Sequence, residues 1–225
     1  MKKLVALLLL LPALTACKKD KPAATPLAPP ADLVFDGHTY KTVRIGGQVW
    51  MAENLRSTHY QNGEDITLKT ADIEWAKETE GYCNPLINDM DVSTEYGKLY
   101  NWYTLTDPRN IAPAGWRVPT QADFNKLISF LGGGANASNA FREKGTTHWP
   151  APNTGATNST GFTAFLSPWR YPDGAFSIDQ NAYWLLSSTT AYDGSVRIFN
   201  VIVNGAESKS TLLKTSGTSI RLIKE

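Results

Sequence analysis

The sequence is poor in the residues that metal sites and covalent catalysis use. It holds two cysteines and three histidines in 225 residues, and the histidines, His38, His59 and His148, lie in separate segments. It contains no Cys-x-x-Cys or His-Glu-x-x-His pair, no Gly-x-Ser-x-Gly motif and no glycine-rich phosphate loop. Isolated histidines are most often surface or core residues. We therefore expect no metal ion, no cofactor and no catalytic residue.

Neither sign of charge is concentrated in the folded part of the chain. The whole sequence has 22 basic and 21 acidic side chains, and 17 and 20 of these fall within residues 32–225. Nucleic-acid binding depends on a basic patch or stripe, which this near-neutral stretch does not offer. We expect no nucleic-acid partner.

Apolar runs long enough to cross a bilayer, about 20 residues, are also missing. The run from Leu4 to Leu11 follows Lys2 and Lys3, as in an export signal. It is followed by "LTAC", which ends at Cys17 and resembles the bacterial lipobox. The sequence therefore predicts a lipoprotein signal peptide over residues 1–16 and acylation of Cys17, whose acyl chains anchor the chain in a membrane. The alternative is an ordinary secretory signal in which Cys17 is incidental.

Residues 17–31 are predicted to be a tether. This segment is rich in proline and has no apolar periodicity. Proline-rich sequence forms a semi-rigid spacer of about 3.1 Å per residue, so residues 18–31 reach on the order of 45 Å. The start, "CKKD", looks like the basic-then-acidic signals that send lipoproteins of some bacteria to the cell exterior. We expect an outer-membrane lipoprotein that is exposed at the cell surface.

Residues 32–225 are expected to form one domain that begins and ends with strands. Asp36-Gly37 and Gly46-Gly47 separate strand-like runs over residues 33–51, which predicts a three-stranded meander. Strand-like runs return over residues 195–203 and 219–224, with a hairpin expected at Asn204-Gly205.

Two segments have the apolar spacing of a helix. One is residues 93–105, although Gly97 weakens it. In the other, Thr120 and Asp123 fit a capping box, and Gly132 fits a helix stop. An apolar stripe lies between them, formed by Phe124, Leu127, Ile128 and Leu131.

Five motifs carry a resemblance to a known family. They are "VRIGGQVWMAENL", "YGKLYNWYTL", "PAGWRVPTQADFNKLISFLGGG", "NSTGFTAF" and "TSIRLIKE". In order and spacing they resemble the Fibrobacter succinogenes major paralogous domain (FISUMP), over essentially Asp32 to Glu225. That family is similar in fold to C-type lectin-like domains and to formylglycine-generating enzymes. The resemblance implies an α+β fold, with two helices packed on a small twisted antiparallel sheet and long irregular loops.

The chain departs from the family at two positions. Members often have cysteines where this chain has Ala112 and Leu222. If those cysteines pair in relatives, apolar packing must replace the stabilisation that a disulfide supplies. The copper chemistry of formylglycine-generating enzymes needs cysteines, and Cys83 is the one cysteine of the domain. That activity therefore does not carry over, and we expect Cys83 to be buried and inert.

Aromatic loops are the best candidates for binding. Trp149, Asn153, Trp169, Tyr171 and Asp173 lie in segments without helix or strand periodicity. Binding residues concentrate on loops, and rigid aromatics supply contact area at low entropic cost. The alternative is that these aromatics are buried and hold the loops in place. Calcium is a weaker candidate, because the oxygen-bearing loop of Asn88, Asp89 and Asp91 lacks the pattern of an EF-hand.

Three functions remain open. We favour a noncatalytic binding or adhesion domain that is tethered to the membrane and binds a glycan or a protein outside the cell. The second is an envelope hydrolase with a site of dispersed carboxylates such as Glu53, Asp65 and Asp173, which would have to converge within about 5 to 10 Å. The third is a structural subunit of an envelope assembly.

Overall fold

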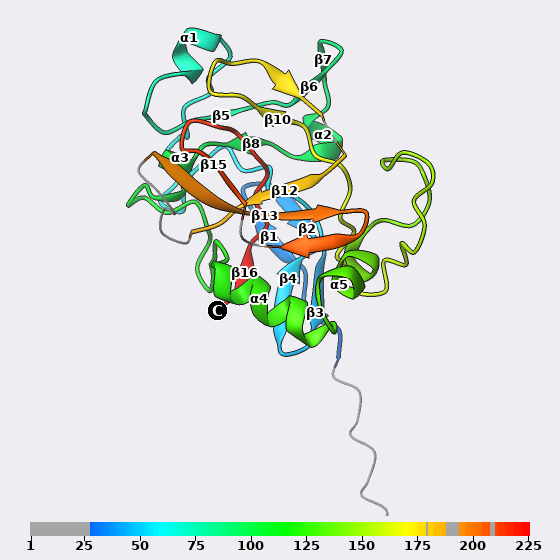
Figure 1. The fold of residues 1–225 in the computed structure, drawn as a ribbon. Coiled ribbons are helices and arrows are strands. Elements are labelled where there is room, and N and C mark those ends of the chain that lie inside the picture. The colour runs from blue at the N-terminus through cyan, green and yellow to red at the C-terminus, as the bar shows by residue number, and fades with distance from the viewer. Residues whose placement is uncertain (1–27, 179, 188–193, 208–209) are drawn as a thin grey trace, which may run out of the picture.

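A computed structural model describes residues 28–178, 180–187, 194–207 and 210–225 (Figure 1). The predicted signal peptide, Cys17 and the tether up to Leu27 lie outside the described residues. Within the described part, no helix has the length and apolar character needed to cross a membrane. The fold is α+β, with few helices and several small antiparallel sheets.

One four-stranded sheet joins the beginning of the domain to its end. Its strand order is β3-β4-β16-β9, and each neighbouring pair is antiparallel. Ile223 of β16 lies opposite Trp50 of β4 on one side and Arg117 of β9 on the other. The strands are β3 (Thr42–Ile45), β4 (Gln48–Met51), β9 (Trp116–Arg117) and β16 (Ile223–Lys224).

The second four-stranded sheet is built around the long strand β13. β12 pairs with one part of β13, and β14 and β15 pair with different stretches of it. The predicted hairpin is confirmed, but Ile202 lies opposite Gly205, so the two turn residues are Val203 and Asn204. The strands are β12 (Ala182–Leu185), β13 (Ser195–Ile202), β14 (Gly205–Glu207) and β15 (Thr211–Leu213).

Four two-stranded ribbons make up the rest of the described sheet structure. They are β1 (Leu33–Phe35) with β2 (His38–Tyr40), β5 (Tyr82–Cys83) with β8 (Leu99–Tyr100), β6 (Leu86–Ile87) with β7 (Met90–Asp91), and β10 (Trp169–Arg170) with β11 (Phe176–Ser177). Both turns predicted within residues 33–51 are confirmed, because Phe35 pairs with His38 and Ile45 with Gln48, but the segment does not form one three-stranded meander. The chain breaks at Lys41, so β1 and β2 form one ribbon while β3 and β4 belong to the four-stranded sheet.

The predicted capped helix is confirmed as α4 (Gln121–Phe130). The Thr120 side chain accepts a hydrogen bond from Asp123 N, and the Asp123 carboxylate accepts one from Thr120 N at 2.7 Å. Burial raises the pKa of Asp123, but hydrogen bonds from Arg117 and Thr120 lower it to about 2. Phe124 and Leu127 are fully buried. This stretch is therefore a structural support of the core.

The helix expected over residues 93–105 is wrong. The segment forms α2 (Ser93–Tyr96), strand β8 and α3 (Trp102–Leu105). Gly97 ends α2 with a φ of 76°, and a Cβ there would lie 2.8 Å from Asn54 Cβ. The second long helix, which packs beside α4, is α5 (Gly134–Phe141) and not the segment expected from the sequence. Its Ser138 Oγ donates a hydrogen bond to Ile202 O. The remaining helix is the short α1 (Asp72–Trp75), which comes first in the chain.

The core consists of aromatic clusters between the two larger sheets. Phe124 of α4 stacks on Phe199 of β13, with ring centroids 3.7 Å apart. Trp50, Trp184 and Phe141 belong to the same cluster. Ala112 and Leu222 are both fully buried in a second cluster, so apolar packing occupies the two positions where relatives often have cysteine.

Three buried arginines attach irregular loops to this core. Buried carbonyl groups need donors, and a guanidinium supplies five of them in a fixed plane. Each guanidinium donates to loop carbonyls and also packs against aromatic rings. The three are Arg142 (Thr154 O; Trp149 ring), Arg170 (Lys69 O, Thr70 O and Gly174 O; Trp75 and Phe176 rings) and Arg221 (Phe162 O and Thr163 O; Phe162 and Trp184 rings).

Candidate functional site

Two of the predicted binding residues, Trp169 and Tyr171, lie together at the surface on the β10–β11 ribbon. They flank Arg170, which is 1% exposed. Because side chains alternate in an extended segment, burial of Arg170 directs Trp169 and Tyr171 to the opposite, outer face. Their ring centroids are 4.0 Å apart; Tyr171 is 40% exposed, whereas Trp169 is partly buried and its indole nitrogen is covered. The pair forms an aromatic surface that a ligand can reach.

Arg170 also fixes the turn that carries this pair. Its Nε donates to Gly174 O at 2.8 Å, and Tyr171 N donates to Ala175 O at 2.8 Å. Gly174 has a φ of 99°, and a Cβ there would lie 2.3 Å from Asp72 Oδ1. The turn is therefore held against Asp72 of α1, which positions Tyr171 at the end of the ribbon.

A hollow of about 290 Å³ borders the aromatic pair. Its wall opposite the pair comes from β15, and Leu213 there is 54% exposed. Tyr183 of β12 supports Trp169 from the side, with ring centroids 6.1 Å apart. The hollow is lined by Trp169, Tyr171, Pro172, Ser195, Thr211, Leu212, Leu213 and Ser216.

The chemistry of the hollow is that of a shallow aromatic platform with hydroxyl groups at its edge. Small-ligand sites combine apolar and aromatic walls with a few polar groups. The flat rings offer faces for stacking, and the Thr211 and Ser216 hydroxyls lie on the lining. Asp173 is exposed at the end of the turn, where its carboxylate accepts a hydrogen bond from Ala175 N at 3.1 Å. This combination suits an uncharged, hydroxyl-rich ligand.

Trp149 and Asn153, two more of the predicted binding residues, lie in the irregular segment after α5 and stabilise the fold. Trp149 is 2% exposed, and its Nε1 donates to Ala164 O at 2.9 Å. Asn153 Nδ2 donates to Glu143 O and Gly145 O, while its side-chain oxygen accepts from Arg142. Both side chains hold the irregular segment after α5 against the core, and neither touches the Trp169–Tyr171 hollow.

The carboxylates considered for hydrolysis are engaged in separate places. Glu53 accepts from Lys41 N at 2.9 Å, Asp65 contacts His59 Nε2 at 3.0 Å, and Asp173 is bound within its own turn. None of the three contacts another.

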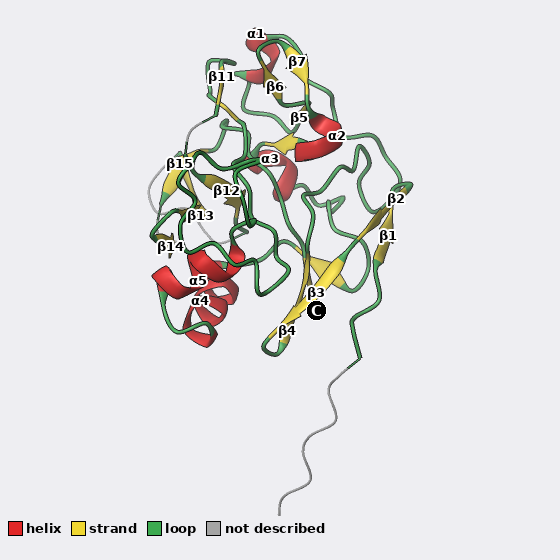
Figure 2. Cartoon of the chain, turned by 90° about the vertical axis from the view of Figure 1, so that its right-hand side faces the viewer, coloured by secondary structure: helices red, strands yellow, loops and turns green. Residues whose placement is uncertain are grey.

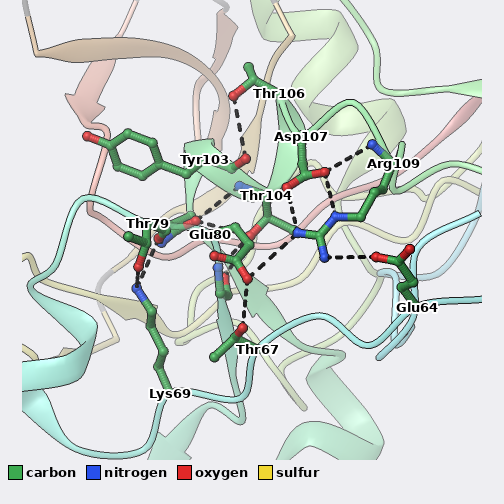
Figure 3. Close-up of polar contacts among 12 residues, drawn as sticks. Glu64, Thr67, Lys69, Thr79, Glu80, Tyr103, Thr104, Thr106, Asp107 and Arg109 are labelled. Carbon is green, nitrogen blue, oxygen red and sulfur yellow. Dashed lines mark hydrogen bonds and ion pairs between the residues drawn. The ribbon is translucent and has the colours of Figure 1, made fainter.

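Carboxylates do converge around Arg109 (Figure 3). Asp107, Glu64 and Glu80 lie 2.6, 3.3 and 3.7 Å from its guanidinium. The ring of Tyr60 lies beneath the guanidinium, 4.1 Å away. Hydrogen bonds from Arg109 outweigh burial and lower the pKa of Asp107. The cluster is an ion network of one cation and three carboxylates that joins loops.

Metal ligands do not gather in the described part of the chain. Within it, no group of three or more His, Cys, Asp or Glu side chains is placed to hold a metal ion. In the loop considered for calcium, Asp91 accepts from Asn84 Nδ2 at 2.7 Å and from Ser93 N at 2.8 Å. Asn88 and Asp89 form the turn of the β6–β7 ribbon with φ angles of 49° and 61°.

Cys83 is buried, as predicted. It is 2% exposed and unpaired, and it packs with Trp75 and Leu99. Burial raises the pKa of its thiol to about 12, even though Arg170 acts in the opposite direction. A thiol that stays protonated is a poor nucleophile.

Sequence reasoning missed Tyr183, Leu212 and Leu213 as neighbours of the aromatic pair. They follow Trp169 by more than ten positions and reach it through the pairing of β12 and β15 with β13. No local sequence pattern predicts the pairing of β12 and β15 with β13. The alternation around Arg170 was the one available signal, since a basic residue between two aromatics defines the two faces of a ribbon.

These features define an α+β domain whose loops are held by buried arginines and which has an aromatic surface hollow beside its β10–β11 ribbon. Residues 43–224 match the family described as the Fibrobacter succinogenes major domain. The chain belongs to that family. No curated protein and no solved structure matches it.

Proposed function

We propose that this protein is a lipid-anchored surface lipoprotein whose domain binds glycans, without catalysis, through the Trp169–Tyr171 hollow. The observation that carries the proposal is the aromatic pair of partly buried Trp169 and exposed Tyr171, whose ring centroids are 4.0 Å apart and which lines a hydroxyl-bearing hollow. The CH face of a sugar ring stacks on an aromatic face, and hydroxyl groups at the rim can bond to the sugar hydroxyls. A protein loop with an apolar side chain is the alternative ligand.

The placement of the hollow supports this proposal. In both views, β15 and the β10–β11 ribbon lie away from the side where residue 28 enters the domain (Figures 1 and 2). A domain anchored through Cys17 would therefore present the hollow away from the membrane. The proposal includes the lectin-like arrangement expected from the family resemblance, in which loops on a small sheet carry the ligand.

The test is a glycan screen with the mature-length chain, residues 17–225 carrying Cys17→Ser, with and without chelator. Tyr171→Ala and Trp169→Ala should each abolish binding of any glycan found, because stacking anchors commonly contribute 2 kcal/mol or more. Tyr171→Ala should lower the free energy of unfolding by about 1 kcal/mol or less, because its side chain is 40% exposed.

Trp149→Ala is the matched control. It should cost about 3 to 5 kcal/mol of stability and leave the affinity of the folded fraction unchanged. The proposal is wrong if Tyr171→Ala and Trp169→Ala retain binding. Cleavage of the bound glycan would instead favour the envelope hydrolase. The anchor is tested separately, because Cys17→Ser in cells should abolish lipid labelling and membrane retention.

A further inference from the structure

A second hollow, of about 520 Å³, lies at the end of the domain where the chain enters. Its lining includes Pro30 and Ala31, the β3–β4 turn and the first turns of α4. Figures 1 and 2 place this turn and α4 at the end opposite α1. The hollow is therefore separate from the Trp169–Tyr171 site and lies beside the tether.

The lining of this hollow is rich in cations. Arg44, Lys126 and Lys224 come from β3, α4 and β16, and all three are exposed. None of them forms an ion pair with a residue in the described ranges. The fourth cation, Arg117, is bound to Asp123 through two contacts of 2.7 and 2.8 Å. Asp123 and Glu225 supply the side-chain carboxylates of the lining, so four cationic side chains face two acidic ones.

An exposed aromatic ring stands next to these cations. Phe130 ends α4 and is 63% exposed. Its ring packs on the β3–β4 turn, where a Cβ at Gly46 would lie 3.1 Å from it. Unpaired cations beside an exposed aromatic are the combination that interfacial protein surfaces use, with the cations at the headgroups and the ring at the acyl boundary.

From this arrangement we propose that the hollow binds the phosphate groups of anionic lipid headgroups in the membrane that anchors the chain. The inference rests on the proposed anchoring at Cys17. The predicted proline-rich spacer from Cys17 to Ala28 would reach about 35 Å at about 3.1 Å per residue, so the membrane would stay within that distance of this end. Tethering raises the effective concentration of headgroups at the hollow, and lysine and arginine bind phosphate through charge-assisted hydrogen bonds. In this orientation the basic hollow faces the membrane, and the Trp169–Tyr171 hollow faces away from it.

The experiment measures sedimentation of the unlipidated chain, residues 17–225 with Cys17→Ser, with vesicles. One set contains phosphatidylcholine alone, and the other contains equal parts of phosphatidylcholine and phosphatidylglycerol. The unlipidated chain should bind the second set, and added salt should weaken the binding. Lys126→Gln/Lys224→Gln should lower partitioning about 30-fold, since each of the two basic residues near an anionic surface contributes about 1 kcal/mol, and about 1.4 kcal/mol is a factor of ten.

Lys77→Gln/Lys144→Gln is the matched control, because it removes the same charge from exposed positions outside the hollow. This control should bind like the parent chain. Equal binding by the two double variants would overturn the proposal, as would equal binding of the parent chain to both vesicle sets. If inorganic phosphate raises the melting temperature of the parent chain but not of Lys126→Gln/Lys224→Gln, and neither vesicle set binds, the ligand is a soluble phosphate and the lipid proposal fails.

The outcome does not depend on whether Cys17 is acylated in cells or whether glycans bind the aromatic hollow. The tested chain carries no acyl group, and lipid labelling and glycan binding are read in separate assays. A failure here is therefore distinct from a failure of the proposed function.

Discussion

Asn54 and Arg221, 167 positions apart, are joined by a buried hydrogen bond of 2.8 Å from Arg221 Nε to Asn54 Oδ1. The same oxygen accepts from Trp184 Nε1 at 2.9 Å, and Asn54 Nδ2 donates to Tyr96 O at 2.8 Å. Arg221 reaches on to the carbonyl groups of Phe162 and Thr163. Four of the five family motifs thus meet at the buried Asn54–Arg221 pair, which makes them determinants of the fold.

Asn54→Ala should lower the free energy of unfolding by about 3 kcal/mol. The change leaves a buried indole N–H and a guanidinium N–H without their acceptor, and each orphaned donor costs about 1 to 3 kcal/mol. Urea denaturation measures the loss. Asn62→Ala, at an exposed turn, is the control and should change stability by less than about 0.5 kcal/mol. Equal midpoints for both variants would show that the Asn54 contacts are not needed.

Thr120→Ala should cost about 1 kcal/mol through loss of the helix cap, and Leu127→Ala about 2 to 5 kcal/mol through a core cavity. Thr120 Oγ1 accepts from Asp123 N, and Leu127 is fully buried. Ser129→Ala, exposed on the same helix, should have little effect. Denaturant midpoints that do not separate these three variants would contradict the support role of α4.

His148 should make stability depend on pH. Its ring contacts Glu95 at 2.6 Å and Glu143 at 2.7 Å. Burial lowers the pKa of His148, but the two carboxylates outweigh it and raise the pKa above the ordinary 6.5. The stabilisation from protonated His148 is therefore complete below pH 6.5 and is lost as the pH rises through the raised value.

We expect the free energy of unfolding of the native chain, relative to His148→Gln, to fall as the pH rises through that window. Thermal melts of the two proteins across neutral pH measure the difference. A constant or growing advantage of the native chain at higher pH would mean that the two carboxylates do not stabilise the charged ring.

Cys83 should resist maleimide in the folded chain at neutral pH and react fully in denaturant. Its pKa of about 12 and 2% exposure leave almost no accessible thiolate. Mass spectrometry reports the labelling, and Cys83→Ala gives the background in the Cys17→Ser chain. Rapid labelling without denaturant would show that the packing of Trp75 and Leu99 around the thiol opens in the folded chain.

Sequence analysis predicted correctly the elements that depend on residues close to one another in the chain. Thr120, Asp123 and Gly132 were enough to place α4, because a cap and a stop depend on neighbours within a few residues. The helix expected over residues 93–105 failed because Gly97 packs against Asn54, which is far away in sequence. Trp149 and Tyr171 have similar sequence contexts, and only tertiary packing buries the first and exposes the second.

Because the strand order is β3-β4-β16-β9, this sheet can be completed only after β16, near the end of the sequence, has been synthesised. Met51 N donates to Leu222 O at 3.0 Å, and the two residues are 171 positions apart. A ribosome that adds about 5 to 20 residues per second needs about 10 to 35 s to make that interval. Throughout it, the β3–β4 hairpin has no sheet partner, because β16 does not yet exist. This sheet is therefore incomplete until β16 emerges, and the proposed export would have this interval in which to move the chain before the sheet has formed.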